Sequence, residues 1–381
     1  MSVSASPKIH VGMDVHKDTV MIAVLPEDAA TPTIVKQLPN DEAKLRRFLA
    51  RVAEDGELRC CYEASGAGYV LHRAIEGWGH TCEIIAPSLI PTRPGHRRKH
   101  DRFDAVELAR QHRAGMLVPV RVPSEAEERV RDLVRCRETF QREILKSRHY
   151  ILKFLRRRGR VFRDGNNWTQ KHLAWIRSLL NDDQLVHEDR DVLSEYLALF
   201  EYKLDRRDEL DRKIEKLALT PLYKEAVGRL RSLRGIDTHG AMVLRSELGD
   251  LRRFATPRQL MAFVGLVPSE HSSGSRENRG SITKAGNSHC RHVLVQAAWS
   301  YRHPPRVGAG LRERQEGVPA HVVAHSWKAQ HRLHKLFRRI EQRRGSTIAV
   351  VAVARELAGF AWAVLQDLES QSVLTSHAEA A

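Results

Sequence analysis

Four acidic residues hold special places in the predicted secondary structure, and their positions restrict the fold more than any other feature of the chain. Asp14 and Glu63 each end a short apolar run of the kind that forms a β-strand. Asp101 and Asp104 lie three residues apart at the start of a predicted helix, so both carboxylates lie on one helix face. A fold that brings the two strand ends to this helix places four carboxylates in one pocket.

Four carboxylates in one pocket predict a metal site. Such groups repel one another unless cations neutralise them. Hard divalent cations with oxygen ligands suit them best, Mg²⁺ first. Many enzymes that carry out displacement at a phosphodiester use two metal ions held by carboxylates. We therefore predict that Asp14, Glu63, Asp101 and Asp104 are both the metal ligands and catalytic residues.

The composition favours a polyanionic partner. The 381 residues, enough for two or three domains, include 63 Lys and Arg against 47 acids, a formal net charge of +16. This excess predicts nucleic-acid binding, with a generically basic protein as the alternative. The five cysteines form no CxxC pair and predict a reduced, cytoplasmic protein. No run of 18 apolar residues is present, so no membrane span is expected.

The first part of the chain predicts a mixed α/β domain. The predicted strands cover residues 9–14, 20–25, 33–38, 58–63 and 81–85, and the predicted helices begin near Asp41 and cover 68–78 and 101–114. The order β-β-β-α-β-α-β-α resembles that of the RNase H type of nuclease fold. In that fold the carboxylates sit on the first strand, on the fourth strand and on a late helix, which are the places of the four acids here.

The middle of the chain predicts a helical hairpin or coiled coil. Two long helices, 124–155 and 186–217, carry apolar stripes that need a partner. The hairpin is either a spacer or a dimerisation arm that also touches nucleic acid. A basic loop, Arg156–Arg160, follows the first helix, and residues 161–183 are assigned only as a linker or accessory helix.

The last third is predicted to be mostly helical. Residues 230–240 form a turn between helices that resembles a helix-hairpin-helix, and an ordinary glycine-capped turn explains it equally well. A segment of small and polar residues, 268–281, separates two well-patterned helices, where functional loops concentrate. The helix after it is expected at 288–301, and the last two at 322–344 and 347–368.

Several motifs together resemble one protein family. They are Gly12-Met13-Asp14-Val15-His16-Lys17, Tyr62-Glu63-Ala64-Ser65-Gly66, Asp101-Arg102-Phe103-Asp104-Ala105, and Ser273-Gly274 followed by Lys284-Ala285-Gly286-Asn287. The set is similar to the DEDD transposases of the one-ten insertion-sequence family, over about residues 8 to 365. Members of that family are recombinases with a serine nucleophile, guided by a structured bridge RNA.

The resemblance implies a division of labour along the chain. It assigns residues 8–120 to a RuvC-like DEDD domain that binds Mg²⁺, 121–220 to a helical coiled-coil linker and 221–368 to a transposase domain with the nucleophile. By motif position the nucleophile is Ser273, although Ser272 is adjacent. The resemblance further implies a phosphoserine intermediate, DNA and a bridge-type guide RNA as partners, and a homodimer or homotetramer.

Two other functions remain open on the residues alone. One is a RuvC-like metal-dependent nuclease or Holliday-junction resolvase that uses water. The other is a non-catalytic nucleic-acid-binding protein whose acids hold a structural ion. A covalent protein–DNA adduct separates the transposase from the resolvase, and metal-dependent strand cleavage separates both from the binding protein.

Residues near the motifs have two readings each. His16 and Lys17 contact phosphate or simply form a turn. The run Arg97-Arg98-Lys99 holds nucleic acid or is a solvated basic segment, and Asp18 and Glu107 are taken as surface acids. Three residues after the serine segment support it or only begin the next helix: Lys284, Asn287 and Arg291.

Overall fold

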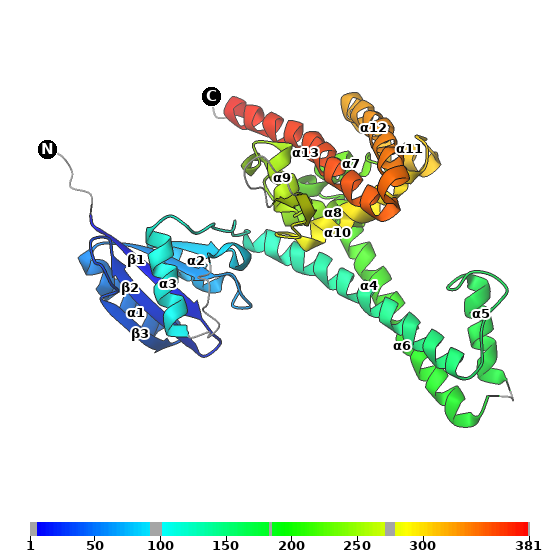
Figure 1. Cartoon of the computed structure of the whole chain (residues 1–381), viewed down its shortest axis with the longest axis horizontal. Helices are drawn as coiled ribbons and strands as arrows, with labels where there is room; N and C mark the ends of the chain where they lie inside the picture. Colours follow the sequence, from blue (N-terminus) through cyan, green and yellow to red (C-terminus); the bar gives the residue numbers. More distant parts are fainter. Residues whose placement is uncertain (1–5, 92–100, 183–184, 271–278, 380–381) are drawn as a thin grey trace. The chain divides into compact units, whose positions relative to one another are not determined.

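The computed structural model describes residues 6–91, 101–182, 185–270 and 279–379. The chain divides into two compact units, Met1–Pro123 and Ser124–Ala381, which are described separately (Figure 1). The run 97–99 and both candidate serines, Ser272 and Ser273, lie outside the described residues.

The first unit is built on a five-stranded mixed sheet in the order β3-β2-β1-β4-β5. The first three strands pair antiparallel, whereas β4 is parallel to β1 and β5 is parallel to β4. The strands are β1 (Lys8–Val15), β2 (Thr19–Pro26), β3 (Ile34–Pro39), β4 (Glu57–Glu63) and β5 (Thr81–Ile85). All five predicted strands are present, each within two residues of its expected bounds.

Helices cover both faces of this sheet. Leucine and isoleucine side chains of α1 (Glu42–Val52) and α2 (Val70–Gly77) pack on one face, against the odd-numbered residues of β1 such as Val11 and Met13. On the other face lies α3 (Asp101–Arg113), whose Ala105, Leu108 and Ala109 are buried against the strands. Asp41 caps the first turn of α1 by accepting a hydrogen bond from the Lys44 amide.

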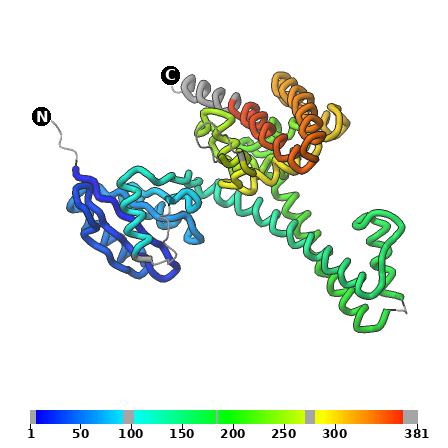
Figure 2. The backbone as a smooth tube through the Cα atoms, in the orientation of Figure 1, coloured from blue at the N-terminus to red at the C-terminus, as the bar shows by residue number. Residues whose placement is uncertain are grey.

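The second unit begins with a long antiparallel hairpin of α4 (Glu125–Arg157) and α6 (His187–Ala218) (Figure 2). A capping box starts α4, because Ser124 and Glu127 each bond the backbone amide of the other. The pairing of Arg137 with Asp211 and of Arg158 with Asp189 fixes the antiparallel direction. The predicted hairpin is therefore confirmed.

The segment between the two hairpin helices is more structured than the sequence suggested. Residues 161–183 include α5 (Gln170–Ser178), which packs beside the far end of the hairpin (Figure 2). Its His172 is fully buried and contacts the rings of Phe162, Trp168 and Trp175. The accessory-helix reading is thus correct for this segment. The basic run after α4 is not wholly a loop, because Arg156 and Arg157 still belong to the helix.

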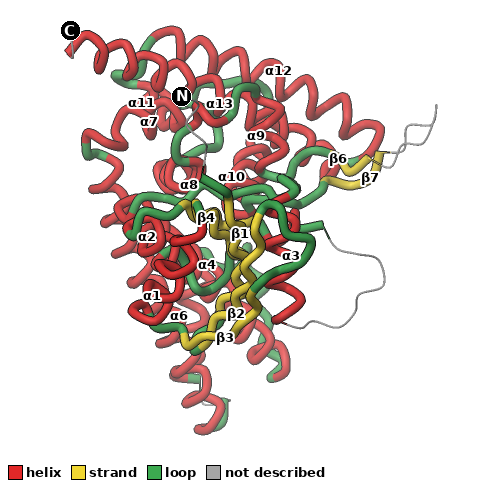
Figure 3. Tube along the Cα trace, turned by 90° about the vertical axis from the view of Figure 1, so that its left-hand side faces the viewer, coloured by secondary structure: helices red, strands yellow, loops and turns green. Residues whose placement is uncertain are grey.

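The rest of the second unit is a helical bundle with one small β-ribbon, β6 (Pro268–Glu270) and β7 (Arg279–Ile282), drawn in yellow in Figure 3. Its helices are α7 (Pro221–Arg231), α8 (Thr238–Leu248), α9 (Pro257–Phe263), α10 (Ser288–Ala298), α11 (Ala309–Gln315), α12 (Ala320–Arg344) and α13 (Ser346–Glu379). Short 3₁₀ turns occur at 53–55, 87–89, 179–181, 251–253 and 299–302. The last of these ends the helix predicted at 288–301, and α13 runs past the predicted end at residue 368.

One segment of α13, Ser346–Gln366, is long and apolar enough to cross a membrane by length and composition alone. Within the unit, however, α13 packs against α7, α9, α10 and α12. Its Ala349, Val353, Leu357 and Ala358 are fully buried in the largest core cluster. The apolar character of this segment is therefore explained by its place as a core helix.

Candidate active site

Two of the predicted acids, Asp14 and Glu63, lie at corresponding positions near the ends of neighbouring strands. The parallel pairing of β1 with β4 runs up to Met13 and Tyr62. Asp14 and Glu63 are the next residue on each strand, and neighbouring strands lie about 4.8 Å apart. Because the strands are parallel, both acids lie at the same edge of the sheet.

The same two acids face the helix on the far side of the sheet from α1 and α2. Strand side chains alternate between faces, so residues two positions apart share a face. Gly12, two residues before Asp14, lies so close to α3 that any side chain there would collide with the backbone of Ala105 and Ala109. Cys61, two residues before the β4 acid, donates from Sγ to the carbonyl oxygen of a residue of α3 at 3.8 Å. Both acids therefore project toward the α3 side.

The other two acids belong to the end of α3 that reaches this edge. The helix runs antiparallel to β1, because His112 contacts His10 near the strand's start, with 3.2 Å between their Nδ1 atoms. From His10 to Asp14 the strand advances about 13 Å, which equals about nine residues of helix counted back from His112. That point is close to Asp104, and Asp101 lies in the turn before it. The fold thus brings all four positions to one corner.

The described side chains at this corner are accessible oxygen donors. The Asp14 side chain is 17% exposed, and its Oδ2 lies 3.2 Å from Nε2 of His16. Glu63 is exposed and Asp104 is half-buried, whereas the side chain of Asp101 lies outside the described part. Among the described side chains, no three His, Cys, Asp or Glu residues are grouped closely enough to hold a metal. Carboxylates are nevertheless the donors that a hard divalent cation prefers, and two strands and a helix supply them at this corner.

The residues around Asp14 have clear structural roles. His16 and Lys17 form the turn between β1 and β2, and the Asn40 side chain donates to both of their carbonyl oxygens at 2.8 and 3.4 Å. Asp18 is exposed, as expected. Glu107 is half-buried instead, and it accepts a hydrogen bond from the Gln111 side chain at 3.0 Å. The surface-acid reading is therefore correct for Asp18 alone.

A histidine pair that the sequence did not suggest lies at the other end of β1. His10 is buried and contacts His112, whose Nε2 is 3.3 Å from Oε2 of Glu83. Burial, followed by the neighbouring His112, lowers the pKa of His10 to about 4. These residues line a cavity of about 260 Å³ together with Arg59. About 13 Å of strand separates His10 from Asp14, so this group is distinct from the acidic corner.

In the second unit, the segment that carries the two serines starts and ends in the β6–β7 ribbon. Pro268 pairs with Ile282, and Glu270 pairs with Arg279. The chain then returns to α9 through Gly286, which has a φ of +72° and lies so close to the Phe263 carbonyl oxygen that a side chain would collide with it. The two ends of the segment are therefore held at a fixed place in the bundle.

Two of the predicted supporting residues tie this return to the bundle. Asn287 caps α10 by accepting from the Cys290 amide at 2.9 Å, and its Nδ2 donates to Oε2 of Glu247 at 2.7 Å. The Arg291 guanidinium donates to the carbonyl oxygens of Val264 and Ala285 at 2.8 and 3.2 Å. Both earlier readings hold for Asn287, which begins a helix and also anchors the chain after the serine segment. Lys284 has a positive φ of 55°, and its amide donates to the carbonyl oxygen of Gly265 at 3.1 Å.

The anchor for Asn287 is a buried carboxylate that the sequence did not reveal. The side chain of Glu247 in α8 is 2% exposed and receives two hydrogen bonds from Arg135 of α4, at 2.6 and 2.9 Å. Burial acts to raise the pKa of Glu247, but the hydrogen bonds from Arg135 and Asn287 outweigh it and hold that pKa below its ordinary value. Because 112 residues separate the two partners, local sequence patterns carry no signal for the pair.

Two expectations about basic surfaces change with the structure. Arg156, Arg157 and Arg158 are all exposed, but Arg158 makes two hydrogen bonds to Asp189, at 2.6 and 2.7 Å, and so closes the hairpin internally. In the turn at 230–240, Asp237 caps α8 by accepting from the Gly240 amide at 2.7 Å. A carboxylate thus occupies the helix start that would receive a phosphate, which favours the ordinary capped turn.

Comparisons with known proteins agree on one family. Residues 11–158 match a family of DEDD transposases, and residues 227–309 match the transposase family IS116/IS110/IS902. The chain is similar to the putative transposase y4qE of Sinorhizobium fredii, with 39% identity over 86% of this chain and 80% of that protein. It is also similar to the transposase for insertion sequence element IS1533 of Leptospira borgpetersenii, with 30% identity over 88% of this chain and 98% of that protein.

A more distant relative spans nearly the whole chain. The transposase for insertion sequence element IS1111A of Coxiella burnetii is 25% identical over 94% of this chain and 90% of its own length. The four acids fall within the first matched region and Ser273 falls within the second. The helix α12 lies outside both regions.

Proposed function

This chain belongs to the IS110 family of DEDD transposases, enzymes that cleave and rejoin DNA, and from that premise we propose a covalent serine mechanism for it. In this proposal Asp14, Glu63, Asp101 and Asp104 bind the metal, and Ser273 is the nucleophile. The family implies the use of a divalent metal, for which we propose Mg²⁺. The protein works in the cytoplasm as a homodimer or homotetramer.

The proposal is supported above all by the positions of the acids in the secondary structure of the RNase H-like domain. Asp14 and Glu63 follow the last paired residues of β1 and β4 on the face toward α3, whose first turns carry the other two acids. A bound divalent cation would act there as a Lewis acid on phosphate oxygens. The protein's own part is to hold these carboxylates on rigid elements.

The proposed chemistry conserves the phosphodiester energy. The Ser273 hydroxyl oxygen attacks a DNA phosphorus atom, forms a serine–phosphate bond and displaces the 3′-oxygen, which takes up a proton as the serine loses one. Attack by a 3′-hydroxyl of a partner strand on the phosphoserine then reverses these changes, so no ATP is needed. The ribbon and the Asn287 anchor support this role, because they fix both ends of the segment that carries the serine.

We further propose that a bridge-type guide RNA selects the DNA sites. The net charge of +16 supports a polyanionic partner, and the family resemblance supplies the identity of the RNA. We assign residues 8–120 to the RuvC-like catalytic domain, 121–220 to the coiled-coil linker and 221–368 to the domain with the serine.

The decisive experiment is to trap the covalent intermediate. Wild-type protein, incubated with labelled DNA, the guide RNA and Mg²⁺, should yield a denaturant-resistant protein–DNA adduct. The adduct should be absent from Ser273→Ala and present in Ser272→Ala, which is the matched neighbour. Adduct in Ser273→Ala but not in Ser272→Ala moves the nucleophile by one residue. Metal-dependent cleavage with no adduct in any of the proteins would support a water-using nuclease and would refute the serine mechanism.

A further inference from the structure

The helix α12 carries the largest formal net positive charge among the described helices. Its 25 residues include seven Lys or Arg and one Glu, a formal net charge of +6 with histidine neutral. The hairpin helices α4 and α6, with 65 residues, carry 17 basic and 16 acidic side chains, a net charge of +1. More than a third of the chain's formal excess of +16 therefore lies on one helix.

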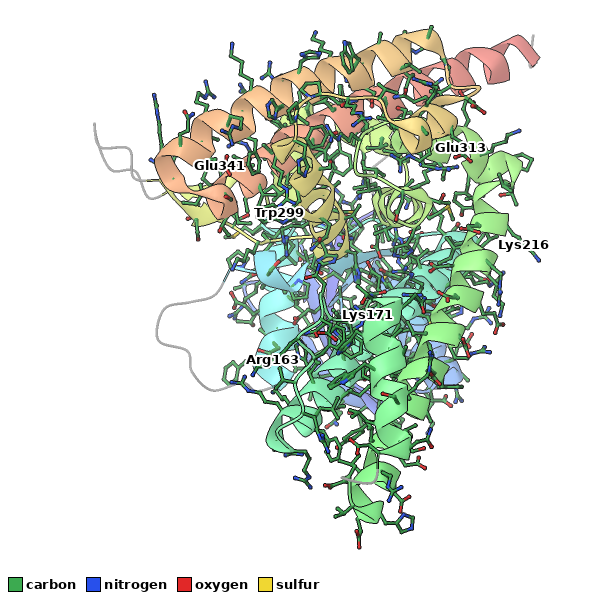
Figure 4. The ribbon with its side chains drawn as sticks, turned by 90° about the vertical axis from the view of Figure 1, so that its right-hand side faces the viewer. Arg163, Lys171, Lys216, Trp299, Glu313 and Glu341 are labelled. Carbon is green, nitrogen blue, oxygen red and sulfur yellow. The ribbon has the colours of Figure 1, made fainter. Side chains whose placement is uncertain are left out.

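The core fixes which side of α12 meets solvent. Val322, Ser326, Ala329, Leu333 and Phe337 are buried, which pins the inner side against the bundle. The outer side shows many side chains with nitrogen ends in Figure 4. Five exposed side chains, four of them Lys or Arg and one His, lie three or four residues apart on that side: Lys328, His331, Lys335, Arg339 and Arg343. They form one stripe about 22 Å long, which we call the α12 stripe.

None of the side chains that the structure describes neutralises the cations of the α12 stripe. Two other arginines of α12 have partners, since Arg332 pairs with Glu356 at 2.7 Å and Arg338 pairs with Glu341 at 2.7 Å. Among the described residues, no carboxylate lies within 4 Å of the four Lys and Arg side chains of the stripe. Like charges left together at this spacing repel one another, and a polyanion relieves that repulsion.

An aromatic pair lies beside the stripe. The indole of Trp327 is 43% exposed, and its ring meets that of His331 edge-on at 4.5 Å between centroids. An exposed tryptophan among cations is typical of a nucleic-acid surface, where rings contact sugars and bases while cations contact phosphates.

We propose that the α12 stripe binds the phosphate backbone of duplex DNA. The proposal depends on the proposed function only for the identity of the partner, because a transposase acts on DNA. A duplex carries one negative charge per about 1.7 Å of axis, so a row of cations about 22 Å long lies against several phosphates at once. Backbone contacts of this kind set the position of DNA without reading its sequence.

The test compares two variants that lose the same charge at different places. The first carries Lys328→Gln, Lys335→Gln, Arg339→Gln and Arg343→Gln. The matched control carries four changes at hairpin cations that are paired with carboxylates of their own helix: Arg129→Gln, Lys146→Gln, Arg206→Gln and Lys213→Gln. Binding of an arbitrary 30-base-pair DNA duplex is measured by fluorescence anisotropy across KCl concentrations, in EDTA and without guide RNA, so that no strand is cut. Thermal unfolding of both variants verifies that they fold.

The expected result is a change in salt dependence for the α12 variant alone. Each lost phosphate contact lowers the slope of log affinity against log salt by about 0.9, so four contacts lower it by about 3 to 4. The control should change the slope by less than about 1. Equal losses in both variants, or no loss in the α12 variant, would overturn the proposal. So would a loss confined to an RNA duplex measured in parallel.

Failure of this proposal is distinguishable from failure of the serine mechanism. At saturating DNA, with guide RNA and Mg²⁺, the α12 variant should form the covalent adduct at the wild-type level, because its catalytic groups are intact. If the wild-type protein forms no adduct while the α12 variant loses duplex affinity, the serine mechanism is refuted and the binding surface is supported.

Discussion

The hairpin and α12 are both rich in arginine, but they use their charges in opposite ways. On α4 and α6, Arg137 pairs with Asp211, Arg158 with Asp189 and Lys213 with Glu209, so the basic side chains stabilise the hairpin's own geometry. On α12 the Lys and Arg side chains of the stripe are exposed, and none of them has an ion pair with a described carboxylate. A count of arginines therefore does not locate a nucleic-acid surface, whereas the count of cations left uncompensated does.

The acidic corner also carries like charges, but there the charges are negative. There the fold places Asp14 and Glu63 at the ends of neighbouring strands and Asp104 in the first turns of α3, and repulsion between like charges opposes any closer grouping. In the proposed complex a bound cation would offset the repulsion at the acidic corner, and DNA would offset the repulsion on α12. Changes at the acidic corner should therefore affect chemistry, changes on α12 should affect affinity, and changes in the hairpin should affect stability.

The largest effect is expected from Asp14→Asn, which removes a charge from the acidic corner. Loss of a metal ligand withdraws several kcal/mol of transition-state stabilisation, so strand transfer should fall by at least about a thousandfold. Duplex affinity and its salt dependence should not change. The measurement is adduct formation and strand transfer in Mg²⁺, with Asp18→Asn as the control, because Asp18 is exposed in the adjacent turn. Wild-type activity in the Asp14→Asn protein would remove this residue from the site.

A smaller effect, on stability alone, is expected from Arg135→Met. The change leaves the buried carboxylate of Glu247 with Asn287 as its remaining side-chain partner, at a cost of about 2 kcal/mol in the free energy of unfolding. That value is below the usual range for a buried pair because the Arg135 side chain is 45% exposed and water takes its place in part. The control is Arg129→Met on the same helix. Its pair with Glu125 is exposed, so the cost there should be under about 0.5 kcal/mol.

The pH dependence of this difference supplies a second check. The pKa of Glu247 is lowered in the folded protein, so its contribution to stability is present above the ordinary glutamate pKa of about 4.3 and is lost as pH falls through the folded pKa. Without Arg135, burial dominates and penalises the charged form. The gap in stability between wild type and Arg135→Met should therefore widen from pH 4 to pH 7 in urea unfolding. A gap that is constant over this range would contradict the charge-based account.

The sequence predicted local features well and long-range pairs poorly. The strands of the sheet, the caps at Asp41 and Ser124 and the two hairpin helices follow from apolar periodicity and capping residues, which act over a few positions. The acids could be proposed because two of them end strands and the other two lie three residues apart at the start of a helix. The bond between Arg135 and Glu247 and the contact between His10 and His112 each join residues about a hundred positions apart, and no short pattern encodes them. Compensation of charge is likewise visible only after folding, because it depends on which partner lies across the hairpin.

The finest test of the comparison lies within one run of arginines at the end of the hairpin. All three arginines are exposed, but Arg158 is held by two hydrogen bonds to Asp189, whereas neither Arg156 nor Arg157 has an ion pair with a described side chain. If compensation decides which cations reach DNA, Arg156→Gln with Arg157→Gln should lower the salt slope of binding by at most about 1.8, and Arg158→Gln should leave it unchanged. The Arg158 change should instead release Asp189 and loosen the turn, which hydrogen exchange of the amides near residues 158–160 and 187–190 would detect. A fall in the salt slope for Arg158→Gln as large as that for its two neighbours would show that this ion pair opens in the complex. Compensation in the free protein would then no longer predict where DNA binds.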